Sequence, residues 1–202
     1  MRLYYSPGAC SLASHIILRE TQASFSLVRV NTGTHRLEDG SDFYALTAKG
    51  QVPLLETDDG LLISEGPVVM QYIADHMEAA ELLPEAGSLG RIRVLEWCNH
   101  LTAEIHKSFT PIFHKVVDAG ATEILKDLLK KKLAFLDGQL SQRPYLAGET
   151  FTIADAYLFV LLNWAPFVKL DLSDLRHLQA FQQRVAGRPA VQAALAAEGL
   201  KA

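Results

Sequence analysis

The chain has 202 residues, of which 49% are hydrophobic and 21% are charged, and its formal net charge is -4. This ordinary globular composition excludes a disordered chain, and the length allows one large domain or two small ones, each with a core of its own. A slightly acidic protein gives no reason to expect a nucleic-acid partner, and no apolar run approaches the roughly 20 residues that span a bilayer.

The first 80 residues alternate between strand and helix patterns. Two apolar runs flank Asp58-Asp59-Gly60, which is a strong hairpin signal. The predicted elements are a strand at 3–5, a helix from 11, a strand at 25–30, a loop at 31–40, a short helix at 41–47, a hairpin over 52–64, and a helix that begins within Ser64-Glu65-Gly66-Pro67. This order predicts an α/β domain over residues 1–80.

The segment 81–87 contains Pro84 and Gly87 and is predicted to be a linker. Everything after it follows helical spacing, with patterns at 89–117, 121–140, 173–185 and 188–200. A further helix is predicted to start at Thr152, where Thr152 and Asp155 have the spacing of a capping box. Residues 88–202 are therefore predicted to form an all-α domain.

The two cysteines, Cys10 and Cys98, do not form a C-x-x-C pair, which is typical of a protein from a reducing compartment. The N-terminus has no uninterrupted apolar stretch of a secretory signal. We therefore expect a cytoplasmic protein that does not associate with membranes.

Cys10 is the most informative residue, because it follows a strand and a turn and directly precedes a helix. Unpaired N–H groups and the positive dipole end at a helix N-terminus stabilise a thiolate. Ser11 is a second candidate donor at the same place. The alternatives are a buried cysteine that acts as a small hydrophobe and a serine that only caps the helix.

Proline at position 53 conflicts with a buried strand, because it removes a donor from the ladder. A cis Val52-Pro53 bond would resolve the conflict and leave the Val52 backbone able to pair with an extended peptide, although the pattern alone favours trans. Glu65 could hold an ammonium group, and the backbone near Gly66 could hold a carboxylate. Helix capping is the competing interpretation for both.

In the helical part, Asn99, Ala103 and His106 share one face at i, i+4 and i+7, with Glu104 and Lys107 beside them. A lone histidine is more often structural than functional. No His, Cys, Asp or Glu set has metal-ligand spacing, so we expect no metal. Glycine fingerprints of phosphate and dinucleotide binding are also missing from the sequence.

Several motifs in this order resemble the bacterial glutathione transferases of the beta class, over the whole length of the chain. They are Ser6-Pro7-Gly8-Ala9-Cys10-Ser11, Gly50-Gln51-Val52-Pro53-Leu54, Ser64-Glu65-Gly66, Asn99 and Glu104-Ile105-His106-Lys107. The resemblance implies a thioredoxin-like N-terminal domain, a helical C-terminal domain, a homodimer with a role in detoxification, and glutathione as co-substrate.

The resemblance also implies roles for individual residues. Cys10 would lie near the glutathione sulfur, Val52 would pair with the glutathione backbone beside a cis Pro53, and the γ-glutamyl end would bind at Glu65 and Gly66. Two positions depart from the common pattern of the family. Position 35, which contacts the glycyl carboxylate and is often Lys, is His35 in this chain, and position 66, which is often Ser, is Gly66. The residues expected from the second domain are Asn99, Ala103, Glu104, Ile105, His106 and, as a neighbour, Lys107.

The expected function is transfer of glutathione to a small hydrophobic electrophile. Catalysis is assigned to Cys10, His106 and Ser11, of which His106 and the helix N-terminus at Ser11 would stabilise the glutathione thiolate. Phe109, Phe113 and Trp164 are candidates for the electrophile pocket, with core packing as their alternative role.

Two roles remain open for Cys10: it positions the glutathione thiol during conjugation, or it exchanges a glutathionyl group in disulfide or dehalogenation chemistry. A non-catalytic binding protein on the same fold is the competing function. A thioredoxin-type reductant is disfavoured because residue 13 is Ala, so the resolving cysteine of a C-x-x-C motif is missing.

Overall fold

The computed structural model describes residues 1–200. The chain divides into two compact units, one of residues 1–83 with the C-terminal segment from Gly187, and one of Pro84–Ala186. None of the helices within residues 1–200 combines the length and the apolar character that a membrane crossing requires.

The N-terminal unit is built on a five-stranded sheet with the order β3-β2-β1-β4-β5. Its strands are β1 (Arg2–Tyr5), β2 (Ser26–Asn31), β3 (Arg36–Leu37), β4 (Leu54–Glu56) and β5 (Leu62–Ser64). The pair β1–β2 is parallel and the other pairs are antiparallel, so the sheet is mixed. The predicted α/β, thioredoxin-like domain is confirmed, but β3 lies in a segment that was predicted to be a loop.

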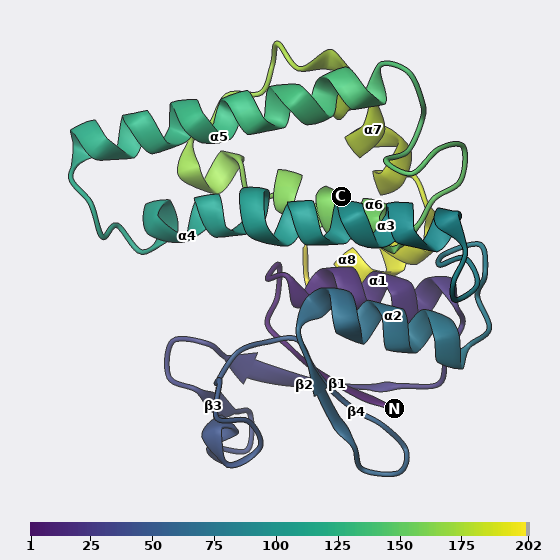
Figure 1. Ribbon diagram of the computed structural model, residues 1–202. Helices are drawn as coiled ribbons and strands as arrows, with labels where there is room; N and C mark the ends of the chain where they lie inside the picture. The colour runs from purple at the N-terminus through teal and green to yellow at the C-terminus, as the bar shows by residue number, and fades with distance from the viewer. Residues whose placement is uncertain (201–202) are drawn as a thin grey trace. The chain divides into compact units, whose positions relative to one another are not determined.

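Three helices belong to this unit: α1 (Ser11–Glu20), α2 (Gly66–His76) and α8 (Pro189–Ala197). Helix α1 packs against both α2 and α8, and α1 and α2 lie side by side along the sheet (Figure 1). A short 3-10 helix, Phe43–Ala45, places Phe43 in a buried cluster with Tyr4, Val30 and Leu54. Apolar side chains thus pack across β2, β1 and β4, and the last two of these strands adjoin the segments of Cys10 and Pro53.

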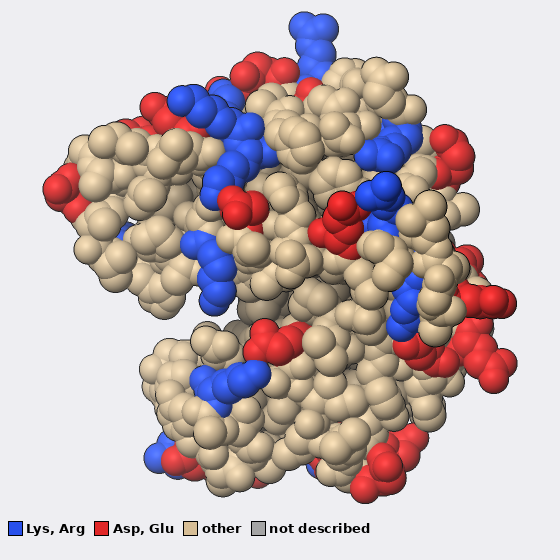
Figure 2. All heavy atoms as spheres, viewed as in Figure 1, with Lys and Arg blue, Asp and Glu red and all other residues tan. Residues whose placement is uncertain are grey.

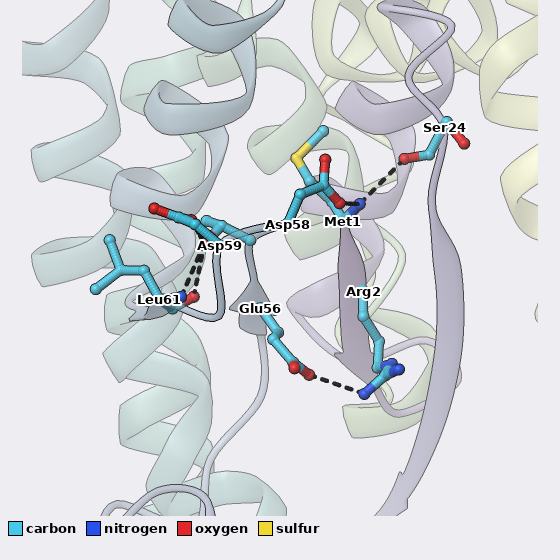
Figure 3. A network of polar contacts seen from close by, with 8 residues as sticks. Met1, Arg2, Ser24, Glu56, Asp58, Asp59 and Leu61 are labelled. Carbon is cyan, nitrogen blue, oxygen red and sulfur yellow. Dashed lines mark hydrogen bonds and ion pairs between the residues drawn. The ribbon is translucent and has the colours of Figure 1, made fainter.

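The β4–β5 hairpin is fixed by polar contacts at its turn and beside β1 (Figure 3). The Met1 ammonium group donates to Asp58, and Arg2 pairs with Glu56 at 3.0 Å. The Thr57 hydroxyl donates to Asp59 and accepts from the Leu61 N–H at 2.9 Å, which closes the Asp-Gly turn. These contacts hold the hairpin that begins directly after Pro53.

The second unit is all-α, as predicted, but its bounds differ from the predicted 88–202: it ends at Ala186, and the helix predicted at 188–200 belongs to the N-terminal unit as α8. The elements of the second unit are α3 (Leu89–His100), a π-helical segment (Leu101–His106), α4 (Lys107–Phe113), α5 (Ala119–Leu140), α6 (Ile153–Leu162), a 3-10 turn (Pro166–Val168) and α7 (Arg176–Ala186). Helix α6 is buried along its whole length and packs against α3, the π-helical segment and α7.

Helix α6 starts with the predicted capping box, which is confirmed. The Asp155 carboxylate accepts hydrogen bonds from the backbone N–H groups of Leu146 and Thr152 and from the Thr152 hydroxyl, each at 2.8 Å. Asp155 is fully buried, and burial raises the pKa of its carboxyl to about 6. The core helix therefore begins at a buried carboxylate that backbone and hydroxyl donors compensate.

Candidate functional site

Cys10 occupies the N-cap position of α1, where the preceding turn delivers it. The Ala9 N–H donates to the Ser6 carbonyl at 3.0 Å, and Gly8 has a φ of +71°, which favours glycine. The side chain is partly exposed, and its thiol donates to the Val52 carbonyl at 3.2 Å. The structure therefore brings together two residues that lie 42 positions apart and were predicted to share one site.

Val52 leads into a cis Val52-Pro53 peptide bond. Pro53 is buried, whereas Val52 is partly exposed, and both residues lie directly before β4. Gly66 lies against the proline ring, because a Cβ built on Gly66 would be 3.9 Å from the Pro53 Cγ and Cδ atoms. Cys10, Val52, Pro53 and Gly66 thus form one continuous group at the starts of α1, β4 and α2, called the thiol edge below.

Glu65 is the N-cap residue of α2 and has a φ of 71°, a strained value for a residue other than glycine. Its exposed carboxylate pairs with the Lys49 ammonium at 2.5 Å, and Lys49 also donates to the Ser64 hydroxyl at 3.1 Å. The structure therefore presents Glu65 as a cation-binding carboxylate at the thiol edge. The sequence interpretation did not include Lys49, although this residue directly precedes the Gly50–Leu54 motif.

His35 lies in the loop between β2 and β3 with a φ of 53°. Its Nδ1 atom is 3.0 Å from the Gly50 carbonyl, and its ring packs against Tyr44 with centroids 4.6 Å apart. These contacts tie His35 to the segment that runs into Val52. They fix the imidazole at a defined place beside the extended backbone before Pro53.

Ser11 is fully buried, and its hydroxyl bonds to the backbone of Ser6, accepting from the N–H at 3.2 Å and donating to the carbonyl at 3.3 Å. The hydroxyl therefore holds the turn that carries Cys10, which makes Ser11 a positioning residue. Its predicted catalytic role then rests on its backbone N–H at the helix N-terminus.

The same turn is anchored by Glu198, which the sequence interpretation did not include. Glu198 accepts from the Gly8 N–H at 2.9 Å and contacts the His15 Nδ1 atom at 2.9 Å, with the side chains of His15 and Glu198 both fully buried. The Arg19 Nε–H is an obligate donor and lies 2.9 Å from the His15 Nε2 atom. The His15 ring therefore accepts from Arg19 at Nε2 and faces Glu198 with Nδ1, so it links Arg19 to the buried carboxylate.

In the helical unit, His106 ends the π-helical segment, a helix type that is rare and often found at functional sites. Its Nδ1 atom is 2.6 Å from the Tyr157 hydroxyl, and its ring meets Trp164 edge-on with centroids 4.9 Å apart. Tyr157 belongs to buried α6 and is only 2% exposed. His106 is therefore oriented by side chains that are distant in sequence.

The neighbours of His106 differ in accessibility. Asn99, Ala103 and Lys107 are exposed, whereas the Ile105 side chain is fully buried in the unit. Glu104 pairs with Lys132 at 2.9 Å, and this hydrogen bond holds the pKa of Glu104 below its usual range. A contact from Ile105 to a ligand would therefore use its backbone.

Phe109, Phe113 and Trp164 form one aromatic cluster that continues from His106. Phe109 and Phe113 stack with centroids 5.7 Å apart, and both meet the Trp164 ring edge-on. Phe113 is 39% exposed, whereas Phe109 is fully buried. The cluster provides an aromatic surface whose outer edge is accessible.

The second cysteine, Cys98, is buried at 2% exposure on α3. Burial and the Asp155 carboxylate raise the pKa of its thiol to about 12. Among residues 1–200, no group of three or more His, Cys, Asp or Glu side chains could hold a metal ion.

Family models match both units. The glutathione S-transferase N-terminal domain matches residues 1–75, and the C-terminal domain matches residues 100–189. The chain is 48% identical to glutathione S-transferase GstA of Escherichia coli O157:H7 over 201 residues, which is 100% of each chain. The chain belongs to the glutathione S-transferase family, as the motifs predicted.

Solved structures agree with this assignment. The beta-class glutathione S-transferase of Sphingomonas chungbukensis superposes with a TM-score of 0.96 at 42% identity, over 100% of both chains. A sphingomonad glutathione S-transferase complexed with glutathione superposes with a TM-score of 0.95 at 43% identity, again over 100% of both chains. The predicted resemblance to bacterial beta-class enzymes is confirmed.

Proposed function

We propose that this glutathione transferase binds reduced glutathione along the thiol edge and activates its thiol for attack on a small hydrophobic electrophile. Family membership supports the activity, and a relative at 43% identity is described as complexed with glutathione. The single observation that carries the site is the Cys10 thiol, 3.2 Å from the Val52 carbonyl beside the cis Pro53. An extended tripeptide pairing with the Val52 backbone would bring its central cysteine to this thiol.

The ends of glutathione have matching partners in the same unit. Its γ-glutamyl ammonium suits the Glu65 carboxylate, which already binds a cation, and its α-carboxylate suits the backbone donors at the start of α2 near Gly66. His35, held beside Gly50, is proposed for the glycyl carboxylate. In this proposal each charged group of glutathione has a partner in the N-terminal unit.

From the helical unit we propose that His106 contacts the glutathione sulfur, with Asn99, Ala103, Glu104, Ile105 and Lys107 bordering the site. The aromatic cluster of Phe109, Phe113 and Trp164 is proposed as the surface that receives the electrophile, because aromatic side chains bind apolar molecules by area and edge contacts. In this arrangement the reacting sulfur belongs to glutathione.

Cys10 is proposed to serve a second reaction, thiol–disulfide exchange. Its thiolate attacks the glutathionyl sulfur of a mixed disulfide, the substrate thiolate leaves and takes up a proton, and Cys10 becomes glutathionylated. A second glutathione then attacks this disulfide, which releases glutathione disulfide and restores the Cys10 thiolate. Ala13 offers no internal resolving thiol, so the second glutathione is required.

Purified protein tests these assignments directly. Wild type should be retained on a glutathione column and should conjugate an activated aryl halide. Cys10→Ala should keep conjugation within about tenfold and lose glutathionyl exchange, while Cys98→Ala, which removes the other thiol, should keep both. Failure of wild type to bind glutathione would favour a non-catalytic binding protein, and equal loss of both reactions in Cys10→Ala would contradict the two roles.

A homodimer is part of the proposal, because each unit exposes large apolar side chains. They include Leu61, Leu62 and Val68 in the N-terminal unit and Leu89, Ile92, Ile124, Leu128 and Phe135 in the helical unit. Apolar residues at this density suit a subunit interface. Light scattering should give twice the chain mass for wild type and a lower mass for Ile92→Glu, whereas a monomeric wild type would reject the dimer.

The remaining partners follow from charge and cysteine content. On the face shown in Figure 2, acidic side chains lie among the basic ones, which does not resemble a nucleic-acid surface. Two separate reduced cysteines support a cytoplasmic location as part of the proposal.

A further inference from the structure

The contact between His106 and Tyr157 has a length that identifies its donor. The Tyr157 hydroxyl lies 2.6 Å from the His106 Nδ1 atom. Bonds donated by N–H groups to oxygen span about 2.7–3.2 Å, whereas bonds donated by hydroxyls span about 2.5–3.0 Å. A neutral imidazole nitrogen is also the better acceptor of the two partners, because its lone pair takes up a proton near pH 6.5, roughly, whereas the oxygen of a neutral phenol is not protonated in water. The hydroxyl therefore donates and Nδ1 accepts.

We propose that Tyr157 is a positioning residue that keeps the proton of neutral His106 on Nε2, so that His106 donates a hydrogen bond to the glutathione thiolate and does not act as its base. The inference rests on the proposed function, in which His106 faces the glutathione sulfur. In a neutral imidazole one nitrogen donates and the other accepts, so a donor at Nδ1 assigns the proton to Nε2.

Packing supports an orienting role for Tyr157. The residue sits on α6, where every residue is buried, two positions after the Asp155 capping group. The imidazole meets the Tyr157 ring at 76° and the Trp164 ring at 72°, so aromatic neighbours on two sides limit its rotation. A hydroxyl delivered by a rigid helix can therefore fix both the tautomer and the ring direction.

The charged neighbours of His106 along its own segment are Glu104 and Lys107. Glu104 is exposed and paired with Lys132, and Lys107 is exposed on α4. The Tyr157 hydroxyl contacts the His106 Nδ1 atom from buried α6. Its neutral hydroxyl sets the tautomer without adding charge to the site.

Tyr157→Phe tests the proposal because it removes only the hydroxyl. Tyr145→Phe is the matched control, since Tyr145 lies in the same unit and packs against Phe151 and Phe181. The readouts are kcat/KM for glutathione with an activated aryl halide as a function of pH, and the ultraviolet absorbance of the bound thiolate. His106→Ala and the double variant complete a double-mutant cycle.

In Tyr157→Phe the acidic limb of the pH profile should move up by about half to one unit, which is a loss of roughly three- to tenfold near pH 6.5. The loss should vanish at high pH, where glutathione ionises unaided, and the KM for glutathione should stay within about twofold. Tyr145→Phe should match wild type. In the His106→Ala background, Tyr157→Phe should have no further effect.

Three results would each overturn the inference and leave the proposed function intact. They are a kcat/KM of Tyr157→Phe that falls equally at every pH, one that does not fall at all, and one that falls further in the His106→Ala background. A wild-type protein that neither binds nor conjugates glutathione would contradict both the proposed function and the inference. Nitrogen NMR of His106 gives an independent reading in the unaltered protein: a proton on Nε2 supports the proposal, and a proton on Nδ1 overturns it.

Discussion

The two units build their functional residues in different ways. In the N-terminal unit the thiol edge depends on backbone features: a helix N-terminus at Cys10, a cis bond at Pro53, and a second helix start at Gly66, directly after the strained Glu65. In the helical unit His106 depends on side chains, chiefly Tyr157, which is 51 positions away. A backbone site is encoded by short local motifs, whereas a side-chain site depends on how the whole helical core packs.

The two cysteines test this contrast most strongly. Cys10 is partly exposed at a helix N-terminus, whereas Cys98 is buried with a pKa raised to about 12. Relative to the ordinary value of 9.0, this shift lowers the thiolate fraction of Cys98 about a thousandfold. In the folded protein at neutral pH, a thiol reagent should therefore modify Cys10 quickly and Cys98 slowly.

Denatured protein provides the control, because both thiols should then react. Cys10→Ala should give no fast reaction in the folded protein. Two fast thiols in folded wild type would show that the core around Cys98 opens, and the contrast between a local site and a rigid helical core would fail.

Asp155→Ala should produce the largest loss of stability. It removes the acceptor of three buried hydrogen bonds, so the donors of Leu146 and Thr152 lose their partner. We expect the free energy of unfolding to fall by about 3 kcal/mol or more, measured by urea denaturation. The conjugation rate should also fall in this variant, because Tyr157, which orients His106, lies in the helix that begins at Asp155.

Asp118→Ala is the matched control for this variant. Asp118 caps α5 by accepting from the Ala121 N–H at 2.9 Å, but it is exposed. Its loss should lower the free energy of unfolding by only about 1 kcal/mol. If the two variants lost equal free energy of unfolding, the burial of Asp155 would make no extra contribution to stability.

The sequence predicts the thiol edge better than the surroundings of His106, and the reason is physical. Cys10, Pro53 and Gly66 each stand in a short motif whose backbone consequences are local. The partners of the Glu198 carboxylate and of His106 are 190, 183 and 51 positions away, and nothing in their own segments signals them.

Two elements were missed for local reasons. Strand β3 has only two residues, Arg36–Leu37, which is too short for an alternating pattern. The π-helical segment Leu101–His106 lies inside a continuous helical pattern, because a single wide turn barely changes the apolar spacing. Position 106 was nevertheless proposed from the resemblance, while Tyr157 was not.

Glu198→Gln probes the turn before Cys10, which a distant side chain anchors. The substitution keeps the size of the group but removes the charge that faces the His15 and Gly8 donors. We expect unfolding to become easier by about 2 kcal/mol, because the site is fully buried. The labelling rate of Cys10 should also change, since Gly8 belongs to its turn.

Glu20→Gln joins the same two segments and serves as the control. Glu20 pairs with Arg188 through two contacts at 2.6 and 2.9 Å but remains partly exposed, so its loss should be smaller, about 1 kcal/mol. It should leave the Cys10 rate unchanged. A changed Cys10 rate in this variant would mean that general loosening of α8, and not the Glu198 contact, controls the turn.

Lys49→Met should have the smallest effect, and its sign is informative. The Lys49–Glu65 pair is about half exposed on both sides, so its removal should alter the free energy of unfolding by less than about 1 kcal/mol. If Glu65 binds the γ-glutamyl ammonium, Lys49 competes with it, and glutathione should bind roughly two- to threefold more tightly to the variant at low salt. Calorimetry at low and high salt should show this gain shrinking as salt screens the pair. Weaker binding would instead mean that Lys49 contacts a glutathione carboxylate, so that the thiol edge, too, depends on a side chain outside its motifs.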